Sequence, residues 1–204
     1  MQDAHVIASV EQLRQVIPAP SPVVQRKVSN QLDSHAQQFI AESPLVFVST
    51  SDRQLNLDVS PKGDLPGFVR VEDPSTLLIP ERPGNRLTYG FQNIIETGSI
   101  GLIFVIPGVR ETLRVNGSAV ITRDPELLAR FVANDKPALL CTRVTIKECF
   151  FHCAKALIRS KLWLPEAWRD GPAKDAAVKS WARSFDMAEA TVRDTLEADC
   201  RNNL

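Results

Sequence analysis

Hydrophobic residues recur every three or four positions in the first part of the chain, a spacing that predicts helices. The first helix carries this spacing at Val6, Val10, Leu13 and Ile17. Asp3 is placed to cap it, and the prolines from Pro18 end it. A second helix is predicted between Ser29 and Ala41, and Ser43-Pro44 ends that one. We therefore expect residues 1–43 to form N-terminal helices.

From residue 44 the pattern is that of strands. Leu45 to Thr50 is an apolar run, and Leu55, Leu57 and Val59 then alternate with polar residues, which predicts a hairpin with one wet face. Further strands are predicted at Val69–Val71, Thr76–Ile79, Ile100–Ile106, Leu113–Ile121 and Leu139–Phe151. One short helix is inserted at Asp124-Pro125-Glu126, with its buried face formed by Leu127, Leu128, Phe131 and Val132. Short strands joined by tight turns favour a small barrel.

The stretch Thr76 to Thr97 combines a strand, a tight turn and a helix. Pro83-Gly84 supplies the turn, and helical spacing is predicted from Arg86 onward. The first turn of a helix has free N–H groups and a positive dipole end, so Arg82 and Arg86 beside it predict an anion site. The alternative is that both arginines are solvated charges at an ordinary turn.

The run around Arg114 alternates between two faces. Leu113, Val115, Ala119 and Ile121 can point into the core, and Gly117 is a candidate bulge. Arg114 then faces a polar cleft or solvent, where the alternative is a surface ion pair with Glu111.

The chain is helical again from Asp175. One helix is marked by Val178, Trp181, Ala182 and Phe185. Asp186 and Glu189 resemble a capping box for a second helix, on which Val192, Leu196 and Cys200 align. We expect a single α+β domain of mainly antiparallel β structure over residues 1–204: a split β-barrel at 44–163, with N-terminal helices and a helical tail at 175–204.

Composition restricts the function classes. The 204 residues are 44% hydrophobic and include 24 basic and 24 acidic residues, so no global field favours nucleic acid or an anionic membrane. No apolar run has the length of a membrane span, and the N-terminus lacks the pattern of a signal peptide. We therefore expect a cytoplasmic protein with no nucleic-acid or membrane partner and with reduced thiols at Cys141, Cys149, Cys153 and Cys200.

The common catalytic motifs are absent from the sequence, including GxGxxG, the Walker loop, GxSxG and HExxH. Cys149, His152 and Cys153 form a possible zinc cluster, but a structural zinc normally has four ligands and no second pair of ligands follows. We expect no metal and leave catalytic residues unassigned. What remains is a set of basic residues suited to phosphate: Lys62, Arg82, Arg86, Arg114, Lys155, Arg159 and Lys161.

Four segments in this order resemble the pyridoxamine 5′-phosphate oxidase-like family of FMN-binding split β-barrels: NLDVSPKGD, TLLIPERPGNR, ETLRVNGSA and ECFFHCAKALIRSKLW. The resemblance covers about Pro44 to Trp168. It implies a homodimer with FMN at the subunit interface. By position, Asn85 and Arg86 would meet the phosphate, Ser60 and Lys62 would lie along the phosphate or ring edge, and Arg114 would flank the flavin. The resemblance places Lys155 and Arg159 near the site as well.

The resemblance implies an FMN-dependent oxidoreductase acting on a small organic substrate. The C-terminal end departs from the true oxidase, which carries an Arg-x-His type of element for its substrate, whereas this tail is helical. Three alternatives stay open: a flavin-binding or sensing protein without turnover, a split barrel that holds haem (with His152 as ligand) or deazaflavin, and a ligand-free barrel whose basic residues are structural ion-pair partners.

Overall fold

The structure is a computed structural model that describes residues 5–133 and 136–203, without the side chains of 202 and 203. The main helices are α1 (Val10–Val16), α2 (Pro22–Gln25), α3 (Ser34–Glu42), α4 (Tyr89–Thr97), α5 (Pro125–Leu128), α6 (Lys155–Ser160), α7 (Ala176–Phe185) and α8 (Glu189–Asn203). The strands are β1 (Leu45–Ser51), β2 (Leu57–Gly63), β3 (Arg70–Asp73), β4 (Thr76–Glu81), β5 (Ser99–Val105), β6 (Thr112–Thr122), β7 (Val132–Ala133), β8 (Lys136–Pro137) and β9 (Leu140–His152). This confirms the predicted α+β fold with helices at both ends.

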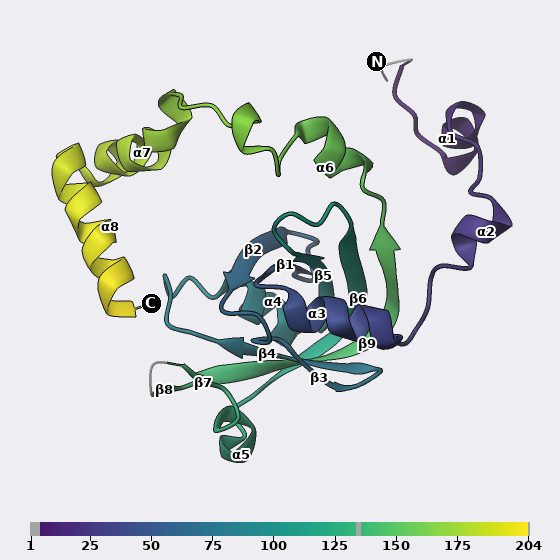
Figure 1. Cartoon of the computed structure of the whole chain (residues 1–204), viewed down its shortest axis with the longest axis horizontal. Helices are drawn as coiled ribbons and strands as arrows, with labels where there is room; N and C mark the ends of the chain where they lie inside the picture. Colours follow the sequence, from purple (N-terminus) through teal and green to yellow (C-terminus); the bar gives the residue numbers. More distant parts are fainter. Residues whose placement is uncertain (1–4, 134–135, 204) are drawn as a thin grey trace.

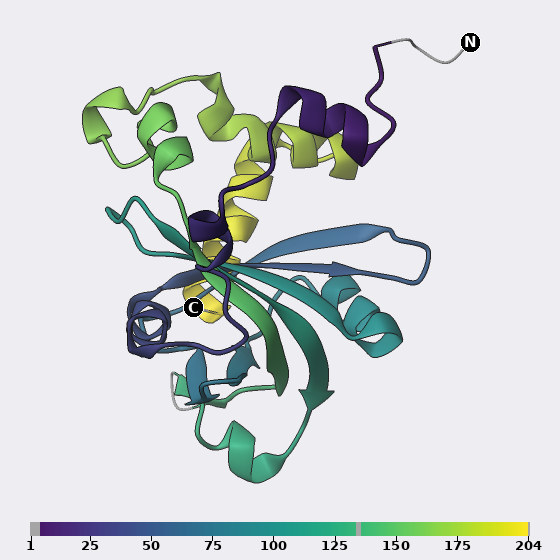
Figure 2. The ribbon, with the colours of Figure 1, turned by 90° about the vertical axis from the view of Figure 1, so that its right-hand side faces the viewer.

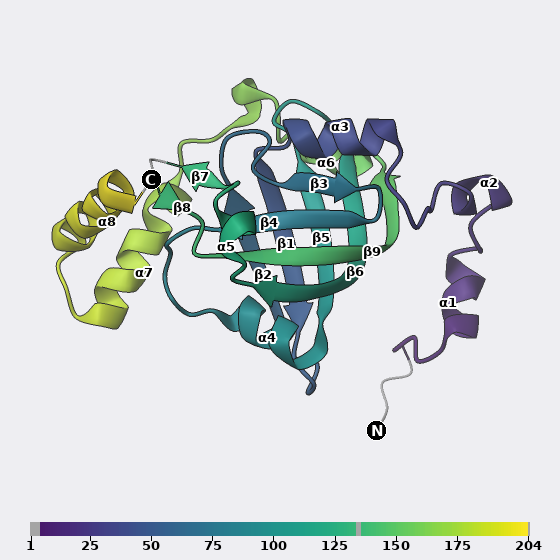
Figure 3. The same ribbon diagram turned by 90° about the horizontal axis from the view of Figure 1, so that it is seen from below.

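Seven strands form one antiparallel sheet in the order β2-β1-β5-β6-β9-β4-β3. The sheet curls, so that β1, β2 and β5 run across the direction of β4 and β9 (Figure 3). The curl brings β2, at one edge of the sheet, toward β4, which is next to the other edge. Side chains from strands that are far apart in the sheet order therefore meet inside the barrel.

A bulge is present at the predicted place, but its extra residue is Lys147 of β9, opposite Asn116 and Gly117, and not Gly117 itself. The register between β6 and β9 shifts between Asn116 and Gly117. At this point the two backbones come so close that a Cβ on Gly117 would lie 2.1 Å from the carbonyl oxygen of Thr145. Glycine is therefore required by space, and the bulge lets these long strands belong to both halves of the barrel.

The core fills the curled sheet and is closed by two helices. Helix α3 is capped by Asp33, whose side chain accepts a hydrogen bond of 2.8 Å from the N–H of Ala36, and the helix buries Ile40. Helix α4 covers another side and buries Ile94. The largest fully buried side chains of this core are Phe104, Ile40, Leu77, Ile79, Leu102 and Leu113.

A smaller cluster lies outside this core, where α5 covers β4 and β9. It contains Leu78, Leu127, Phe131, Ala138 and Cys141. Burial raises the pKa of the Cys141 thiol to about 11, which keeps it protonated and unreactive.

The hairpin β1–β2 has the predicted alternation, but the polar face is the one that turns inward. Asp58 and Ser60 are half-buried, whereas Leu57 and Val59 are 75% and 62% exposed. The reason is that the inner face of β2 borders a cavity and not the packed core. The apolar residues are left on the outer face of the sheet.

Both ends of the chain extend away from the barrel. Figure 1 shows α1 and α2 on one side, and α6 to α8 arching over another. In the view of Figure 2 the purple α1 and the yellow-green α7 both lie above the strands of the sheet. Helices α1 and α2 bury no residue, whereas α7 packs against α8, and Ala182 on α7 and Val192 on α8 are buried. No helix in the described part of the chain is long and apolar enough to cross a membrane.

Several predicted boundaries were wrong. The predicted Asp3 cap lies outside the described residues; Ser9 caps α1, and the proline segment forms the short α2. The second helix begins only at Ser34, because Ser29 pairs with Cys149 as an isolated bridge. Val132 is exposed in β7 rather than buried on a helix.

The C-terminal tail also differs from its prediction. Asp186, which was predicted to cap the last helix, instead ends α7 in a left-handed conformation, and Cys200, predicted to align with Val192 and Leu196, is exposed.

Candidate functional site

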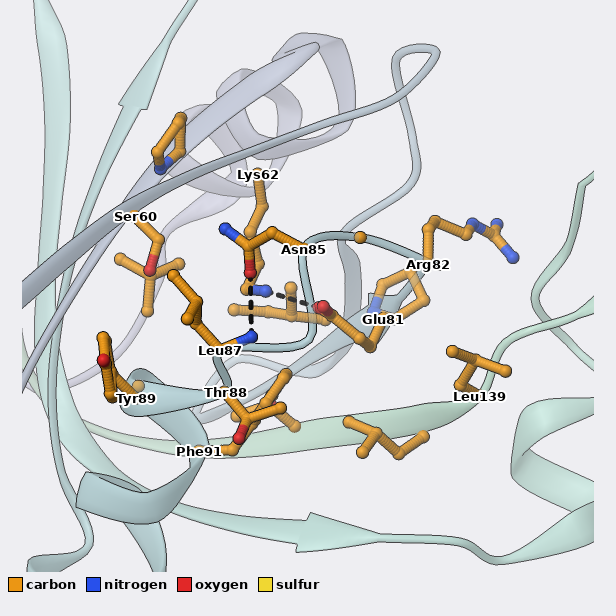
Figure 4. Close-up of a pocket in the computed structure, with 18 of the residues that line it drawn as sticks. Ser60, Lys62, Glu81, Arg82, Asn85, Leu87, Thr88, Tyr89, Phe91 and Leu139 are labelled. Atoms are coloured by element: carbon orange, nitrogen blue, oxygen red, sulfur yellow. Dashed lines mark hydrogen bonds and ion pairs between the residues drawn. The ribbon is translucent and has the colours of Figure 1, made fainter. Parts of the chain in front are cut away.

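A cavity of about 1030 Å³ opens between the inner face of β2, the end of β4, the following loop and the start of α4. Figure 4 shows Ser60, Lys62, Glu81, Asn85 and Tyr89 around it. The predicted residues Ser60, Lys62, Arg82, Asn85 and Arg86 all line this cavity, although they come from two separate segments, β2 and the loop after β4. Its apolar wall is formed by Phe68, Ile79, Leu87, Phe91, Ile94, Leu139 and Leu140.

The strand β2 places three polar side chains in a row on its inner face. Asp58, Ser60 and Lys62 alternate with Val59 and Pro61, so they point to the same side of the sheet. The hydroxyl of Ser60 donates a hydrogen bond of 2.9 Å to Asp58 Oδ2.

Asp58 also lies against the first turn of α4. A Cβ on Gly90 would be 3.1 Å from Asp58 Oδ2. The positive end of the helix therefore already faces a carboxylate, which it stabilises. This carboxylate occupies the position at the helix start that the sequence suggested for a phosphate.

Lys62 is paired inside the cavity. Its ammonium donates to Glu81 at the end of β4 and lies 4.8 Å from the ring centre of Phe91. The side chains of Lys62 and Glu81 are only 20% and 23% exposed, so the pair is part of the cavity wall. Figure 4 shows the contact between them.

Arg82 is also occupied. Its Nε donates to Asp64 Oδ2 at 3.2 Å, and its Nη1 donates to the carbonyl oxygen of Phe131 at 3.0 Å. The side chain points away from the Lys62–Glu81 pair (Figure 4). Arg82 thus ties three segments of the fold together, which is a structural role.

The loop after Arg82 differs from its prediction, because α4 begins at Tyr89 and not at Arg86. Asn85 Oδ1 accepts a hydrogen bond of 3.0 Å from the N–H of Leu87, which forms a turn. Arg86 and Thr88 adopt left-handed conformations with φ of 63° and 57°. Non-glycine residues rarely adopt this region, and such positions occur often at binding sites.

Arg86 is exposed at this loop, and within residues 5–133 and 136–203 no hydrogen bond or ion pair occupies its side chain. It is the cation of the cavity that remains available to a ligand. Asn85 presents its amide group beside it.

Arg114 lies on the opposite face of the sheet. In the strand register it stands between Ile103 and Phe150, and its guanidinium is 5.5 Å from the ring centre of Phe150. It does not line the cavity of its own chain. The described residues contain no ion pair between Arg114 and Glu111.

Lys155 and Arg159 lie on α6 beyond the last strand and do not line the cavity either. The Cys149–His152–Cys153 cluster is also separated. Cys149 is buried, with its thiol donating to the carbonyl of Gln31 at 3.2 Å, whereas His152 and Cys153 are exposed. Among the described residues, no three His, Cys, Asp or Glu side chains gather as metal ligands.

Four cavity carboxylates were missed by sequence reasoning: Asp58, Asp64, Glu81 and Asp199. Asp58 carried a signal, because it stands two residues before Ser60 in an alternating strand. Glu81 carried none, since its neighbour Lys62 is reached only through the curl of the sheet.

Comparisons with known proteins agree with this fold. The sequence model of the family described as "Pyridoxamine 5'-phosphate oxidase" matches residues 32–153, more than half of the chain. No curated protein matches.

Among solved structures, HupZ from Group A Streptococcus has 18% identity and a TM-score of 0.49, covering 59% of this chain and 93% of that one. A putative pyridoxamine 5'-phosphate oxidase from Lactobacillus delbrueckii has 23% identity and a TM-score of 0.48, covering 60% and 95%. An FMN-binding protein from Syntrophomonas wolfei has 15% identity and a TM-score of 0.46, covering 58% and 84%.

Proposed function

Because the chain belongs to the pyridoxamine 5′-phosphate oxidase family, we propose that it is an FMN-binding flavoprotein and an oxidoreductase of a small organic substrate. The observation that carries this proposal is Arg86, an exposed guanidinium in a strained loop at the cavity that has no ion pair with any described residue. A flavin phosphate is a dianion that needs such a fixed, charge-assisted donor.

The remaining lining fits the rest of the cofactor. Asn85 would assist Arg86 at the phosphate, Ser60 would serve the polar ribityl chain, and Lys62 would stand at the edge of the ring, where a substrate can also reach it. Phe91, Ile94 and Leu139 supply an apolar wall for a planar ring. When bound, FMN supplies the electron transfer itself. The chain binds and orients it and limits the access of water.

We further propose a homodimer that meets on the outer face of the sheet. One row of this face joins Phe47, Ile103, Arg114 and Phe150 in register. Phe47 and Ile103 are 38% and 37% exposed, and Leu57 and Val59 of the neighbouring strand are more so. Such a contiguous apolar face is typical of an interface. Arg114 would then approach a flavin only within the dimer.

Oxidoreductase activity is tested by anaerobic reduction. We expect NADH or NADPH to bleach the long-wavelength absorbance of the bound flavin at least tenfold faster than that of free FMN. Air or an added quinone should then restore the absorbance. A bound flavin that is reduced no faster than free FMN by either nicotinamide would instead favour a binding or sensing protein without turnover.

A further inference from the structure

The cavity carries more negative than positive side chains. Its cations are Lys62, Arg82 and Arg86. Its carboxylates are Asp58, Asp64, Glu81 and, from α8, Asp199. An anionic ligand can therefore bind well only at a cation that the protein has not already neutralised.

Two of the three cations are neutralised within the wall. Lys62 is paired with Glu81, and Arg82 with Asp64 at 3.2 Å. Both pairs are largely withdrawn from solvent, with each side chain between 20% and 27% exposed. A phosphate brought to Lys62 would also approach the carboxylate of Glu81, and the repulsion would oppose the attraction.

Resting on the proposed function, we infer that the substrate of this flavoprotein is a neutral, unphosphorylated molecule recognised by the Lys62–Glu81 pair. The phosphate of FMN takes Arg86. Among the described residues that line the cavity, no second cation is then free to hold a phosphorylated substrate.

The pair is suited to a group that carries a hydrogen-bond acceptor beside a donor, such as a carboxamide or a lactam. The ammonium of Lys62 has three N–H donors, and one of them is used by Glu81. The carboxylate of Glu81 keeps acceptor capacity on its other oxygen. A ligand carbonyl can accept from Lys62 while its adjacent N–H donates to Glu81, and neither charge has to be separated from its partner.

The test compares two probes that differ only in a phosphate group, pyridoxamine and pyridoxamine 5′-phosphate. Their affinities are measured on the FMN-loaded protein by flavin fluorescence or calorimetry. For the wild type we expect the two affinities to agree within about threefold. For Glu81→Gln, which frees the charge of Lys62, we expect pyridoxamine 5′-phosphate to bind at least about tenfold tighter than pyridoxamine.

Two further variants control this result. Glu72→Gln removes a carboxylate that pairs with Arg143 at 2.8 Å outside the cavity, and it should keep the wild-type ratio. Glu81→Gln combined with Lys62→Gln should lose the gain. The inference is overturned if the wild type already prefers the phosphorylated probe tenfold, or if Glu81→Gln folds and shows no gain. If Glu81→Gln does not fold, the wild-type ratio alone decides.

The flavin content of each sample separates this inference from the proposed function. If the protein retains no FMN, the proposed function fails, and the charge argument is tested on the flavin-free chain with inorganic phosphate. One bound phosphate in the wild type and two in Glu81→Gln support it, and equal numbers overturn it.

Discussion

Replacing Arg86 by alanine is expected to weaken FMN binding by about one to two decades. The cost of a lost charge-assisted contact is about 1.5 to 3 kcal/mol. Arg86 has no hydrogen bond or ion pair within the described chain and is exposed, so its removal should leave the unfolding midpoint unchanged. Fluorescence titration of the flavin-free protein with FMN measures the affinity, and thermal unfolding measures the stability.

Arg82→Ala is the matched control. Arg82 holds Asp64 and the carbonyl of Phe131, so its loss should lower the unfolding midpoint and reduce FMN affinity less than Arg86→Ala does. An Arg86→Ala variant that binds FMN as tightly as the wild type would remove Arg86 from the site. The phosphate would then have to lie elsewhere.

Replacing Gly117 by alanine is expected to destabilise the protein by about 3 kcal/mol. The new Cβ would lie 2.1 Å from the carbonyl oxygen of Thr145 and 3.0 Å from its carbonyl carbon. Both are backbone atoms of the longest strand, so the clash cannot be relieved by rotating a side chain. Urea unfolding, followed by circular dichroism, gives the change in the free energy of unfolding.

Gly171→Ala provides the comparison, because a Cβ there meets nothing within 4 Å. It should change the free energy of unfolding by no more than about 0.5 kcal/mol. If Gly117→Ala and Gly171→Ala have the same free energy of unfolding, β6 and β9 do not approach each other this closely at the bulge. The described curl of the sheet would then be wrong as well.

Most of the fold could be predicted from the sequence, because strand and helix periodicities are local properties. The run Leu139–Phe151 differs from β9 by one residue at each end. Boundaries failed where the chain makes contacts that are distant in sequence: Ser29 is held in an extended bridge by Cys149, although the apolar spacing there is helical. The predicted start of α4 was wrong for another reason: a non-glycine residue with a left-handed backbone, such as Thr88, has no recognisable signal in the sequence.

The sequence pointed to the cations that line the cavity and not to its carboxylates, and it also pointed to Arg114, Lys155 and Arg159, which do not line the cavity. Basic residues at strand ends and turns pointed to Lys62 and Arg86, and both line the cavity. Whether such a cation is free depends on its spatial neighbours. Lys62 meets Glu81 only because a curled sheet brings β2 to β4, and Arg82 meets Phe131 across an inserted helix.

The face on which a residue lies was the other unknown. Arg114 was expected at a polar cleft, and alternation placed it correctly away from the core. Alternation does not say whether that outer side of the sheet meets solvent, a second copy or the flavin. Its contact with Phe150 became visible only through the register of β6 and β9.

Native mass spectrometry of the purified protein tests the central claim most directly, because it reports the number of chains and the bound cofactor in one spectrum. We expect a species of two chains with two noncovalently bound molecules whose released mass is that of FMN. A single chain at micromolar concentration without flavin, or a dimer that releases haem or a deazaflavin, would contradict the account.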